Sequence, residues 1–429
     1  MTDSPTIEIE PLTEAAPDEA RQSRLATTFA ALETPAFRML ALNSLLMITM
    51  IQIAVAAQNV VAYDLTGNNR SVGFVQSSLG AAMLLNTLLS GAVADRVAKK
   101  RLIWLTQTAI FCVALFLIAL TWTGMLNIYL LALAAFFLGS SMSYFGPAQL
   151  SFLGEILPMQ RRANAAALIQ VTLHTARTIG PLLAGAMLAS QAIDTKGTYI
   201  VLAAISLPLL YTAFRLPLHP PPPPSGAHVI HEIREGLRHV AHNRRLLEVV
   251  LAFFVVTMVG FSTVVVLPGY TKDVLHSGKE GFGIIMAANA LGSLVAAFVV
   301  ASLPNAHRAS MLMWSCCFVF ALLTSLTGLM PTFTLAVIVF FFAGIFSAAY
   351  QTLLSAAFLH RAGPAYYGRV VSITMLAWSF TNLLGLLVGA VADLTSERAV
   401  LVGVGLALAG IVVVMALWSR SGREAAEPA

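Results

Sequence analysis

Twelve stretches of mostly apolar residues, separated by short polar breaks, constrain this chain more than any other feature of its sequence. Each is about as long as the 20 residues that a helix needs to cross a bilayer. Of the 429 residues, 58% are apolar and 10% are charged, whereas a soluble domain is about 25% charged. The stretches lie near residues 38–62, 72–94, 102–122, 127–152, 164–189, 198–215, 248–271, 281–303, 310–329, 332–358, 368–392 and 399–418. We therefore predict an all-α integral membrane protein with twelve transmembrane helices in a lipid bilayer.

Neither the N-terminal residues nor the cysteines of this chain indicate secretion or metal binding. The first 36 residues contain seven acidic side chains and no apolar core, so we expect a solvated tail rather than a secretory signal. Cys112, Cys316 and Cys317 fall inside predicted spans, without the spacing of metal ligands. We expect them to pack as small side chains, with no disulfide framework, no metal site and no cofactor.

The distribution of Lys and Arg predicts how the helices are oriented, because basic loops are retained on the cytoplasmic side of a membrane. Nineteen of the 25 Lys and Arg residues fall in the two terminal segments and the loops on their side, and five fall in the alternate loops. We therefore expect a multi-pass protein of the cell (inner) membrane with cytoplasmic N- and C-termini. The same asymmetry explains the sequence pI near 9.2, so nucleic acid is not an expected partner.

A proline-rich segment divides the chain between spans six and seven. Pro217 and the run from Pro220 to Pro224 cannot continue a helix and predict a semi-rigid linker. Residues 228–245 combine charges with apolar residues at helical spacing, which predicts an amphipathic helix at the cytoplasmic surface. The expected organisation is a cytoplasmic tail (1–36), a six-helix bundle (37–216), the linker (217–246), a second six-helix bundle (247–418) and a second tail (419–429).

The two predicted bundles are related by an internal repeat. At an offset of about 209, residues 64–67 after span one match residues 273–278 after span seven. At an offset of 205, Gly180 in span five matches Gly385 in span eleven. Parallel repeats place a central cavity between two bundles, and rocking of the bundles exposes it alternately to each side. The repeat therefore predicts two pseudo-symmetric bundles and a transport architecture.

Residues 91–101, Gly-Ala-Val-Ala-Asp-Arg-Val-Ala-Lys-Lys-Arg, resemble the signature of the major facilitator superfamily after span two. The general resemblance extends over residues 37–418 and implies that superfamily's fold and a secondary transport function. It also implies a gating role for Gly91, Asp95 and Arg96. A carboxylate beside cations can hold one arrangement of the bundles by hydrogen bonds that break when the bundles rock. Ala98 stands where the superfamily usually has glycine, so a less sharp turn is expected.

Span five resembles the antiporter motif of the same superfamily, with alanine at three of its glycine positions. Gly180, Pro181 and Gly185 keep the pattern. Small residues allow close helix packing and proline bends the span, so this stretch is expected to seal the cavity in an exporter. Plain close packing, as in any transporter, is the alternative.

A narrower resemblance points to the enterobactin-exporter branch of the superfamily, which also includes drug-efflux proteins. It is carried by residues 145–148 (Phe-Gly-Pro-Ala), 155–158 (Glu-Ile-Leu-Pro), 163–165 (Ala-Asn-Ala) and 176–181 (Ala-Arg-Thr-Ile-Gly-Pro). The branch implies export of small amphipathic compounds, siderophore-like or drug-like, by alternating access. Substrates differ widely within the branch.

Arg177 is the single Lys or Arg that lies away from the ends of the predicted spans. A cation at the bilayer centre costs about 2.5–3.5 kcal/mol on insertion scales, so its side chain should face protein or a water-filled cavity. Gln170, His174, Arg177 and Pro181 fall on one helical face, and the superfamily resemblance implies that this helix borders the cavity. We expect His174 and Arg177 to contact substrate or a coupling proton, with a hydrogen-bonded structural pair as the alternative.

Further cavity candidates lie on spans one and eleven. Gln52 and Asn59 share one face of span one, and Trp378 and Asn382 lie where the repeat places the counterpart of the Arg177 stripe. Tyr144, Gln149 and Asn289 are other polar residues within spans; for all of these, an interhelical hydrogen bond is the alternative to lining the cavity. These alternatives stay open at the level of sequence.

The position of the acidic residues limits how transport is coupled to an ion. No predicted span carries Asp or Glu near its middle, so a coupling proton would use His174 or an edge carboxylate such as Asp64. Uncoupled diffusion, or import of a nutrient, requires the same fold. A membrane-embedded enzyme would need a nucleophile and base or clustered metal ligands at membrane depth, which the sequence lacks. The absence of a Walker A sequence also argues against direct use of ATP.

Overall fold

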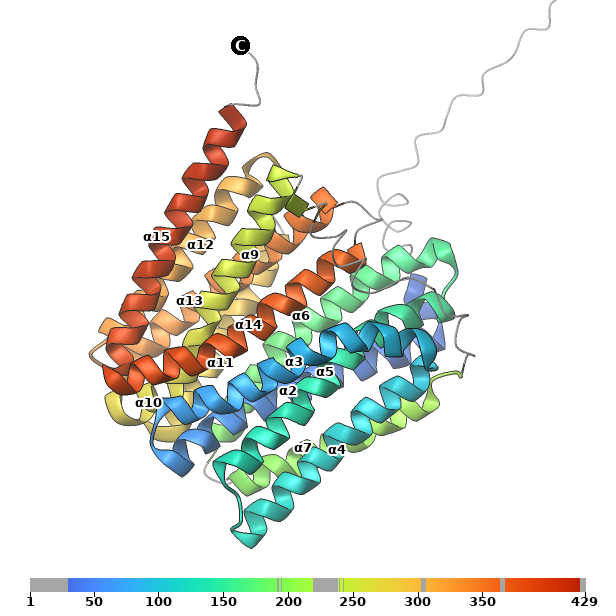
Figure 1. Cartoon of the computed structure of the whole chain (residues 1–429), viewed down its shortest axis with the longest axis horizontal. Coiled ribbons are helices and arrows are strands. Elements are labelled where there is room, and N and C mark those ends of the chain that lie inside the picture. Colours follow the sequence, from blue (N-terminus) through green and yellow to red (C-terminus); the bar gives the residue numbers. More distant parts are fainter. Residues whose placement is uncertain are drawn as a thin grey trace, which may run out of the picture.

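The computed structural model describes residues 30–190, 193, 195–218, 238, 240–241, 243–301, 306–362 and 367–424, with the side chains of most of them. The first half consists of α2 (Pro35–Thr66), α3 (Asn69–Arg96), α4 (Lys99–Thr123), α5 (Ile128–Ile156), α6 (Met159–Ala189) and α7 (Thr195–Arg215), after a short 3-10 turn, η1 (Ala30–Glu33). The second half consists of α9 (Arg244–Ser262), η2 (Thr263–Val266), α10 (Leu267–Gly269), η3 (Tyr270–Val274), α11 (Gly278–Ala301), α12 (Ala306–Leu329), α13 (Phe333–Ala362), α14 (Tyr367–Leu394) and α15 (Glu397–Glu424). The described ranges contain no strand, and Figure 1 shows the two halves as adjoining groups of long helices.

Every predicted span coincides with helix in the described ranges, so the predicted all-α fold is confirmed. Ten of the described helices are long and apolar enough to cross a membrane. The long helices α3 and α6, of 28 and 31 residues, contain side chains outside the described part of the structure, and both lie at the boundary between the halves.

The seventh predicted span, residues 248–271, is helical but irregular. The α-helix α9 stops at Ser262, and a 3-10 turn, one short α-turn and a π turn follow. Pro268 explains this change, because proline has no N–H and its ring would collide with the Val264 carbonyl in a regular helix. The tighter and wider turns on either side of Pro268 allow the chain to remain helical. The predicted linker helix at 228–245 lies largely outside the described residues.

Local sequence accounts for two of the turns between helices. Gly67 and Gly124 end α2 and α4 with φ of 68° and 70°, a conformation that glycine adopts without a steric penalty. Asn68 and Asn127 then cap α3 and α5 by accepting hydrogen bonds from N–H groups in the first turns. The α2–α3 and α4–α5 turns therefore follow from residues inside them.

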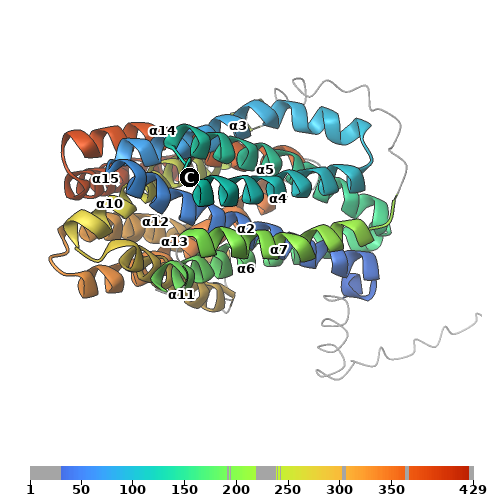
Figure 2. The ribbon, with the colours of Figure 1, turned by 90° about the horizontal axis from the view of Figure 1, so that it is seen from below.

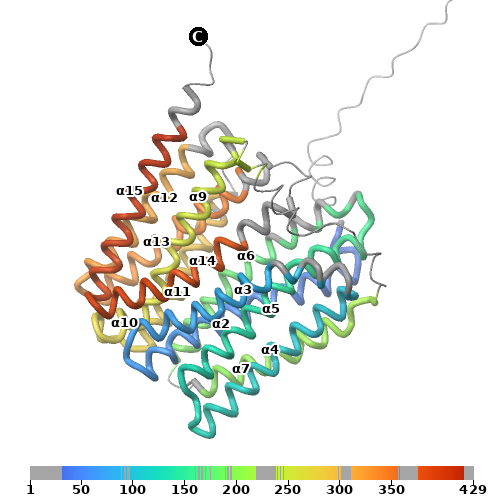
Figure 3. The backbone as a smooth tube through the Cα atoms, in the orientation of Figure 1, coloured from blue at the N-terminus to red at the C-terminus, as the bar shows by residue number. Residues whose placement is uncertain are grey.

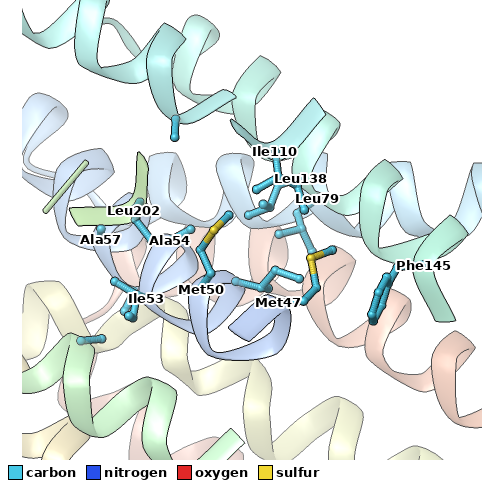
Figure 4. Packing of buried hydrophobic residues seen from close by; sticks show 14 of the residues in the cluster. Met47, Met50, Ile53, Ala54, Ala57, Leu79, Ile110, Leu138, Phe145 and Leu202 are labelled. Carbon is cyan, nitrogen blue, oxygen red and sulfur yellow. The ribbon is translucent and has the colours of Figure 1, made fainter. Parts of the chain in front are cut away.

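The largest apolar core forms around α2. Most of its side chains come from the helices of the first half, and they include Met47, Met50, Ile53, Leu79, Ile110, Leu138 and Leu202 (Figure 4). All seven are at least 95% buried. The same cluster continues into the second half through Val265, Leu267, Phe282, Ile285 and Phe340. In the second half, a separate buried cluster takes residues from α9, α11, α12, α13, α14 and α15. The largest core therefore spans the boundary between the halves, and the second half has buried apolar residues of its own.

Polar side chains inside the halves form the interhelical hydrogen bonds expected as the alternative to lining a cavity. Gln149 on α5 donates to Ser44 on α2, and Tyr144 on α5 donates to Asn86 on α3 over 3.0 Å. Asn289 on α11 donates to a backbone carbonyl of α13 over 3.3 Å. Such bonds orient helices that have little hydrophobic drive to associate in lipid.

Asn43 and Gln107 form the most complete of these polar contacts. Asn43 Nδ2 donates to Gln107 Oε1 over 3.2 Å and to Thr212 Oγ1 over 2.8 Å. Gln107 Nε2 returns a bond of 2.6 Å to Asn43 Oδ1. The cluster connects α2, α4 and α7, and its position within one half indicates a structural role.

The halves meet along two helix pairs, α3 with α14 and α6 with α11. Figure 2 shows these pairs on opposite sides of the molecule, and the backbone trace shows α3 and α14 side by side near its middle (Figure 3). Large apolar side chains on the outer helix surfaces remain exposed, among them Trp122, Phe214 and Val414, each at least 66%. Surfaces of this kind suit lipid contact.

Candidate functional site

Two reciprocal contacts join the halves at the end that carries the α2–α3 turn. We call this region the paired end; it comprises residues 63–70, 268–274 and 389–397. The Tyr63 hydroxyl donates a hydrogen bond to the Asp273 carboxylate. Lys272 Nζ lies 3.0 Å from Asp64 Oδ1 and 5.5 Å from the centroid of the Tyr63 ring. Tyr63-Asp64 corresponds to Lys272-Asp273 in the internal repeat, so the first residue of each pair contacts the second residue of the other.

Asp393, in the last turn of α14, caps the N-terminus of α3 in the other half. Its Oδ1 accepts a hydrogen bond from Asn69 N–H over 2.8 Å, and its Oδ2 accepts one from Arg70 N–H over 2.9 Å. Asn69 Nδ2 donates to Glu397 Oε1 over 2.8 Å. These N–H groups have no partner within their own helix, and the carboxylate also lies at the positive end of the helix dipole. The first turn of α3 therefore depends on a residue of the opposite half.

A buried amide cluster lies one helical turn inside the paired end. Gln76 Nε2 on α3 donates to Asn59 Oδ1 on α2 over 2.7 Å. Gln58, Asn59 and Gln76 are at most 6% exposed. Gln58 Nε2, Asn59 Nδ2 and Gln76 Oε1 have no hydrogen-bond partner among the described residues. Buried polar atoms without partners are costly, so we expect this cluster to oppose closure of the paired end.

Glycines allow the backbones of the two halves to approach closely. A Cβ atom at Gly73 on α3 would lie 2.5 Å from the Gly385 carbonyl oxygen on α14. A Cβ atom at Gly185 on α6 would overlap the Gly283 carbonyl oxygen on α11. Both helix pairs are thus packed too tightly for a larger side chain at these points.

Gly180 makes a different contact from Gly185. A Cβ atom at Gly180 would lie 2.5 Å from Gln52 Cβ on α2, so this close approach is inside the first half. Pro181 lies next to it within α6. Of the three motif residues in span five, the structure thus brings Gly185 to the boundary between halves and Gly180 against Gln52.

Arg177 and Trp378, predicted separately on spans five and eleven, lie together across the boundary between halves. The guanidinium carbon is 5.5 Å from the centroid of the Trp378 ring. Both side chains are half-buried. Asn382, one turn further along α14, lies against Gly80 of α3, and its Nδ2 donates to the Trp378 carbonyl over 2.9 Å. The contact between Arg177 and Trp378 is a cation–π interaction.

The remaining predicted site residues have backbones in helices but side chains outside the described part of the structure. They are Gly91, Asp95 and Arg96 at the end of α3, and Gln170 and His174 on α6. Near the first group, Lys99 begins α4, and its Nζ lies 3.8 Å from Glu155 Oε1 at the end of α5. Lys99 is 2% exposed, so this ion pair links the signature stretch to α5 in a largely buried setting.

Sequence reasoning missed most of the paired end. It singled out Asp64, but not Tyr63, Lys272, Asp393 or Glu397 as site residues. The internal repeat contained a usable signal for the first two, because it aligned Asp64 with Asp273 and hence Tyr63 with Lys272. Asp393 and Glu397 follow span eleven, and no sequence pattern around them indicates that their partners lie at the start of α3.

Comparison with known proteins agrees with this architecture. Residues 39–385 and 249–429 match the family described as the Major Facilitator Superfamily. The chain belongs to the Major Facilitator Superfamily. The Enterobactin exporter EntS of Escherichia coli O1:K1 / APEC is 29% identical over 367 residues, which cover 83% of this chain and 84% of that protein. EntS of Shigella boydii serotype 18 gives the same figures.

Solved transporters share the fold of this facilitator. A POT family transporter, in complex with a thioalcohol conjugated peptide, superposes with a TM-score of 0.67 at 12% identity and covers 89% of this chain and 96% of its own. The nucleoside transporter NupG superposes with a TM-score of 0.64 at 17% identity and covers 89% of this chain and 99% of its own. Membership in the superfamily makes this chain a multi-pass membrane transporter of a small molecule, and not an enzyme.

Proposed function

We propose that this facilitator exports small amphipathic compounds, siderophore-like or drug-like, from the cytoplasm by alternating access. The observation that carries the proposal is the reciprocal contact of Tyr63 with Asp273 and of Lys272 with Asp64. Contacts of this kind join the halves at one end and can be exchanged for water when the halves rock. Similarity to EntS, whose name states enterobactin export, supports the outward direction.

The orientation within this proposal follows from the loop charges. Both termini and the linker at 217–246 would face the cytoplasm, and the paired end would face outward across the inner membrane. The structure would then represent a state closed to the outside. Asp95 and Arg96, with Gly91, would form the corresponding gate on the cytoplasmic side, and Gly180, Pro181 and Gly185 would keep the helices close enough to prevent leaks.

Transport direction can be tested with everted membrane vesicles, in which an exporter moves its substrate inward. Candidate compounds come from comparing the small molecules retained by cells with and without the chain. We expect compounds that accumulate in cells lacking it to be taken up by everted vesicles that contain it. If the compounds that differ were instead depleted in cells lacking the chain, and were taken up only by right-side-out vesicles that contain it, the chain would be an importer.

Proton antiport is the coupling that we propose for this export. Arg177 and His174 on α6, with Gln52, Asn59, Gln170, Trp378 and Asn382, form the proposed set for substrate or proton contact. Asp64 is a second candidate for the proton, and its ion pair with Lys272 would connect proton binding to the paired end. Purified protein should release protons when the exported compound is added. An unchanged release in a His174→Ala variant would remove His174 from the mechanism and leave Asp64→Asn as the next test.

A further inference from the structure

We propose that Arg177 and the aromatic side chains beside Trp378 form a subsite for an anionic group attached to an apolar, ring-containing body. This inference rests on the proposed function, because it names the class of compound that such a transporter would carry. It assigns separate tasks to the two halves. The cation comes from α6 in the first half, and the aromatic surface comes from the second half.

The charge of Arg177 is not balanced by any described residue. Its side chain has no ion pair and no hydrogen bond to a described residue, and the Trp378 ring is its described partner. All Asp and Glu residues of the spanning helices lie near helix ends. A guanidinium cannot lose its proton in a protein, so this position stays positive. The interior of the transporter therefore favours a negatively charged ligand.

The hydrogen-bonding groups of Arg177 have no partner among the described residues, and the described contact of its side chain is with the Trp378 ring. A guanidinium is planar, carries five N–H donors at its edge, and can stack on an aromatic ring through its face. A cation–π contact with the Trp378 ring does not require those donors. They form a fork that suits the paired oxygens of a carboxylate or a similar oxyanion.

Trp378 begins a continuous series of aromatic contacts in the second half. Its ring centroid lies 5.2 Å from that of Phe261 on α9. Phe261 stacks on Phe320 of α12 at 6.0 Å, and Phe320 packs on Tyr350 of α13 at 5.3 Å. Trp378 and Phe261 are half-buried, whereas Phe320 and Tyr350 are buried. Trp378 and Phe261 thus present a supported aromatic surface next to the cation, which suits a flat apolar ring.

This arrangement predicts selection by charge among compounds of equal shape. An anionic ring compound can pair with Arg177 and stack beside Trp378 at the same time. Its neutral amide keeps the stacking and loses the charge, and a cationic analogue meets like charge. The order of affinity should therefore be anion, then neutral amide, then cation.

Equilibrium dialysis against the full-length protein in lipid nanodiscs tests this order, with empty nanodiscs to subtract partition into lipid. The probes are 1-naphthoate, 1-naphthamide and 1-naphthylmethylammonium, which share one ring system. We expect 1-naphthoate to bind about tenfold or more tightly than 1-naphthamide, as a charge-assisted bond would give. Equal affinities for the three probes, or no binding of 1-naphthoate, would overturn the proposal without any variant.

Variants then test which residues produce the preference for the anionic probe over the neutral one. Arg177→Gln should abolish the preference for 1-naphthoate, and Arg177→Lys should keep part of it. Trp378→Leu should weaken 1-naphthoate and 1-naphthamide alike. Arg162→Gln, at an exposed arginine that bonds backbone carbonyls, and Trp104→Phe, at a 42% exposed tryptophan, are matched controls that should change neither. An unchanged preference in a folded Arg177→Gln protein would contradict the assignment.

Failure of this proposal can be told apart from failure of the proposed function. Binding of 1-naphthoate with the expected preference, but without export in everted vesicles, would uphold the subsite and contradict the exporter. Export of compounds that are neutral or cationic, with no preference for 1-naphthoate, would uphold the exporter and contradict the subsite.

Discussion

The Tyr63 hydroxyl donates a hydrogen bond to the Asp273 carboxylate across the boundary between the two halves. Its repeat-related partner, the Lys272 ammonium, binds the Asp64 carboxylate in the opposite direction. The donor position of the repeat is therefore tyrosine in the first half and lysine in the second, and the position after it is aspartate in both. An ancestral pairing of two like halves would be self-complementary, as in an isologous dimer interface, and here the donors have diverged while both carboxylates remain.

The two contacts should differ in strength, although they are related by the repeat. Tyr63 is 3% exposed, and a hydrogen bond to a charged group contributes about 1.5–3 kcal/mol. The Lys272 and Asp64 side chains are each 45% exposed, and such ion pairs contribute about 0.2–1 kcal/mol. Tyr63→Phe should thus lower the ratio of molecules closed to molecules open at the paired end by about tenfold or more. Asp64→Asn should lower the same ratio by less than about fivefold.

The distance between spin labels at Leu65 and Leu394 measures this population. These exposed residues lie at the paired end in opposite halves, and the three native cysteines would be replaced first. Longer distances should gain weight in Tyr63→Phe more than in Asp64→Asn. The reverse order would show that the exposed ion pair, and not the tyrosine, holds the paired end.

The Asp393 cap gives a second prediction. Loss of a helix cap costs about 0.5–2 kcal/mol, and this cap exists only while the halves are in contact. Asp393→Ala should therefore shift the Leu65–Leu394 distances toward separation. Asn68→Ala removes a cap of the same helix that lies within one half, so it should lower the melting temperature without changing the distances. Equal distance distributions in both variants would contradict a conformational role for Asp393.

Glycine packing gives a third prediction. Gly185→Ala places a methyl group against the backbone of α11, and such overpacking typically costs about 1–3 kcal/mol. The strain exists only when α6 and α11 are in close contact, so this variant should favour separation at the paired end. Gly403→Ala is the matched control, because a Cβ atom there has open space around it. A shift of similar size in both variants would indicate a general helix effect.

How much of this protein could be predicted from its sequence depends on the type of interaction. The positions of the helices follow from apolar runs about 20 residues long, and these runs are independent of tertiary contacts. The repeat also placed the counterpart of Arg177 at Asn382, one turn from Trp378, but it gave no sign that the Arg177 and Trp378 side chains touch. The helix positions are thus a local property of the chain, whereas this contact is not.

The contacts between distant residues were not accessible in this way. Asn69 and Glu397 are 328 positions apart, and a polar side chain near a helix end has many partners available to it. The buried pair of Asn59 and Gln76 shows the same limit. Asn59 was expected to face the cavity or to form an interhelical bond, and the structure gives the bond, to an α3 residue that no pattern had identified.

The amide cluster gives the final prediction, which concerns the energy of closing the paired end. Gln76→Leu alone leaves the Asn59 amide buried without its partner, at a cost of about 1–3 kcal/mol, so it should favour the open paired end. Asn59→Leu combined with Gln76→Leu removes both amides. The closed state then no longer contains their unpaired buried atoms, and the open state no longer gains free energy from hydrating them. The double variant should therefore be closed at the paired end more often than the wild type, as measured by the Leu65–Leu394 distances.

The control for this prediction is an amide pair within the first half. Asn43→Leu with Gln107→Leu removes that pair, so it should lower the melting temperature and leave the distances unchanged. If the Asn59–Gln76 double variant opened the paired end as much as Gln76→Leu does, the cluster would stabilise closure rather than oppose it.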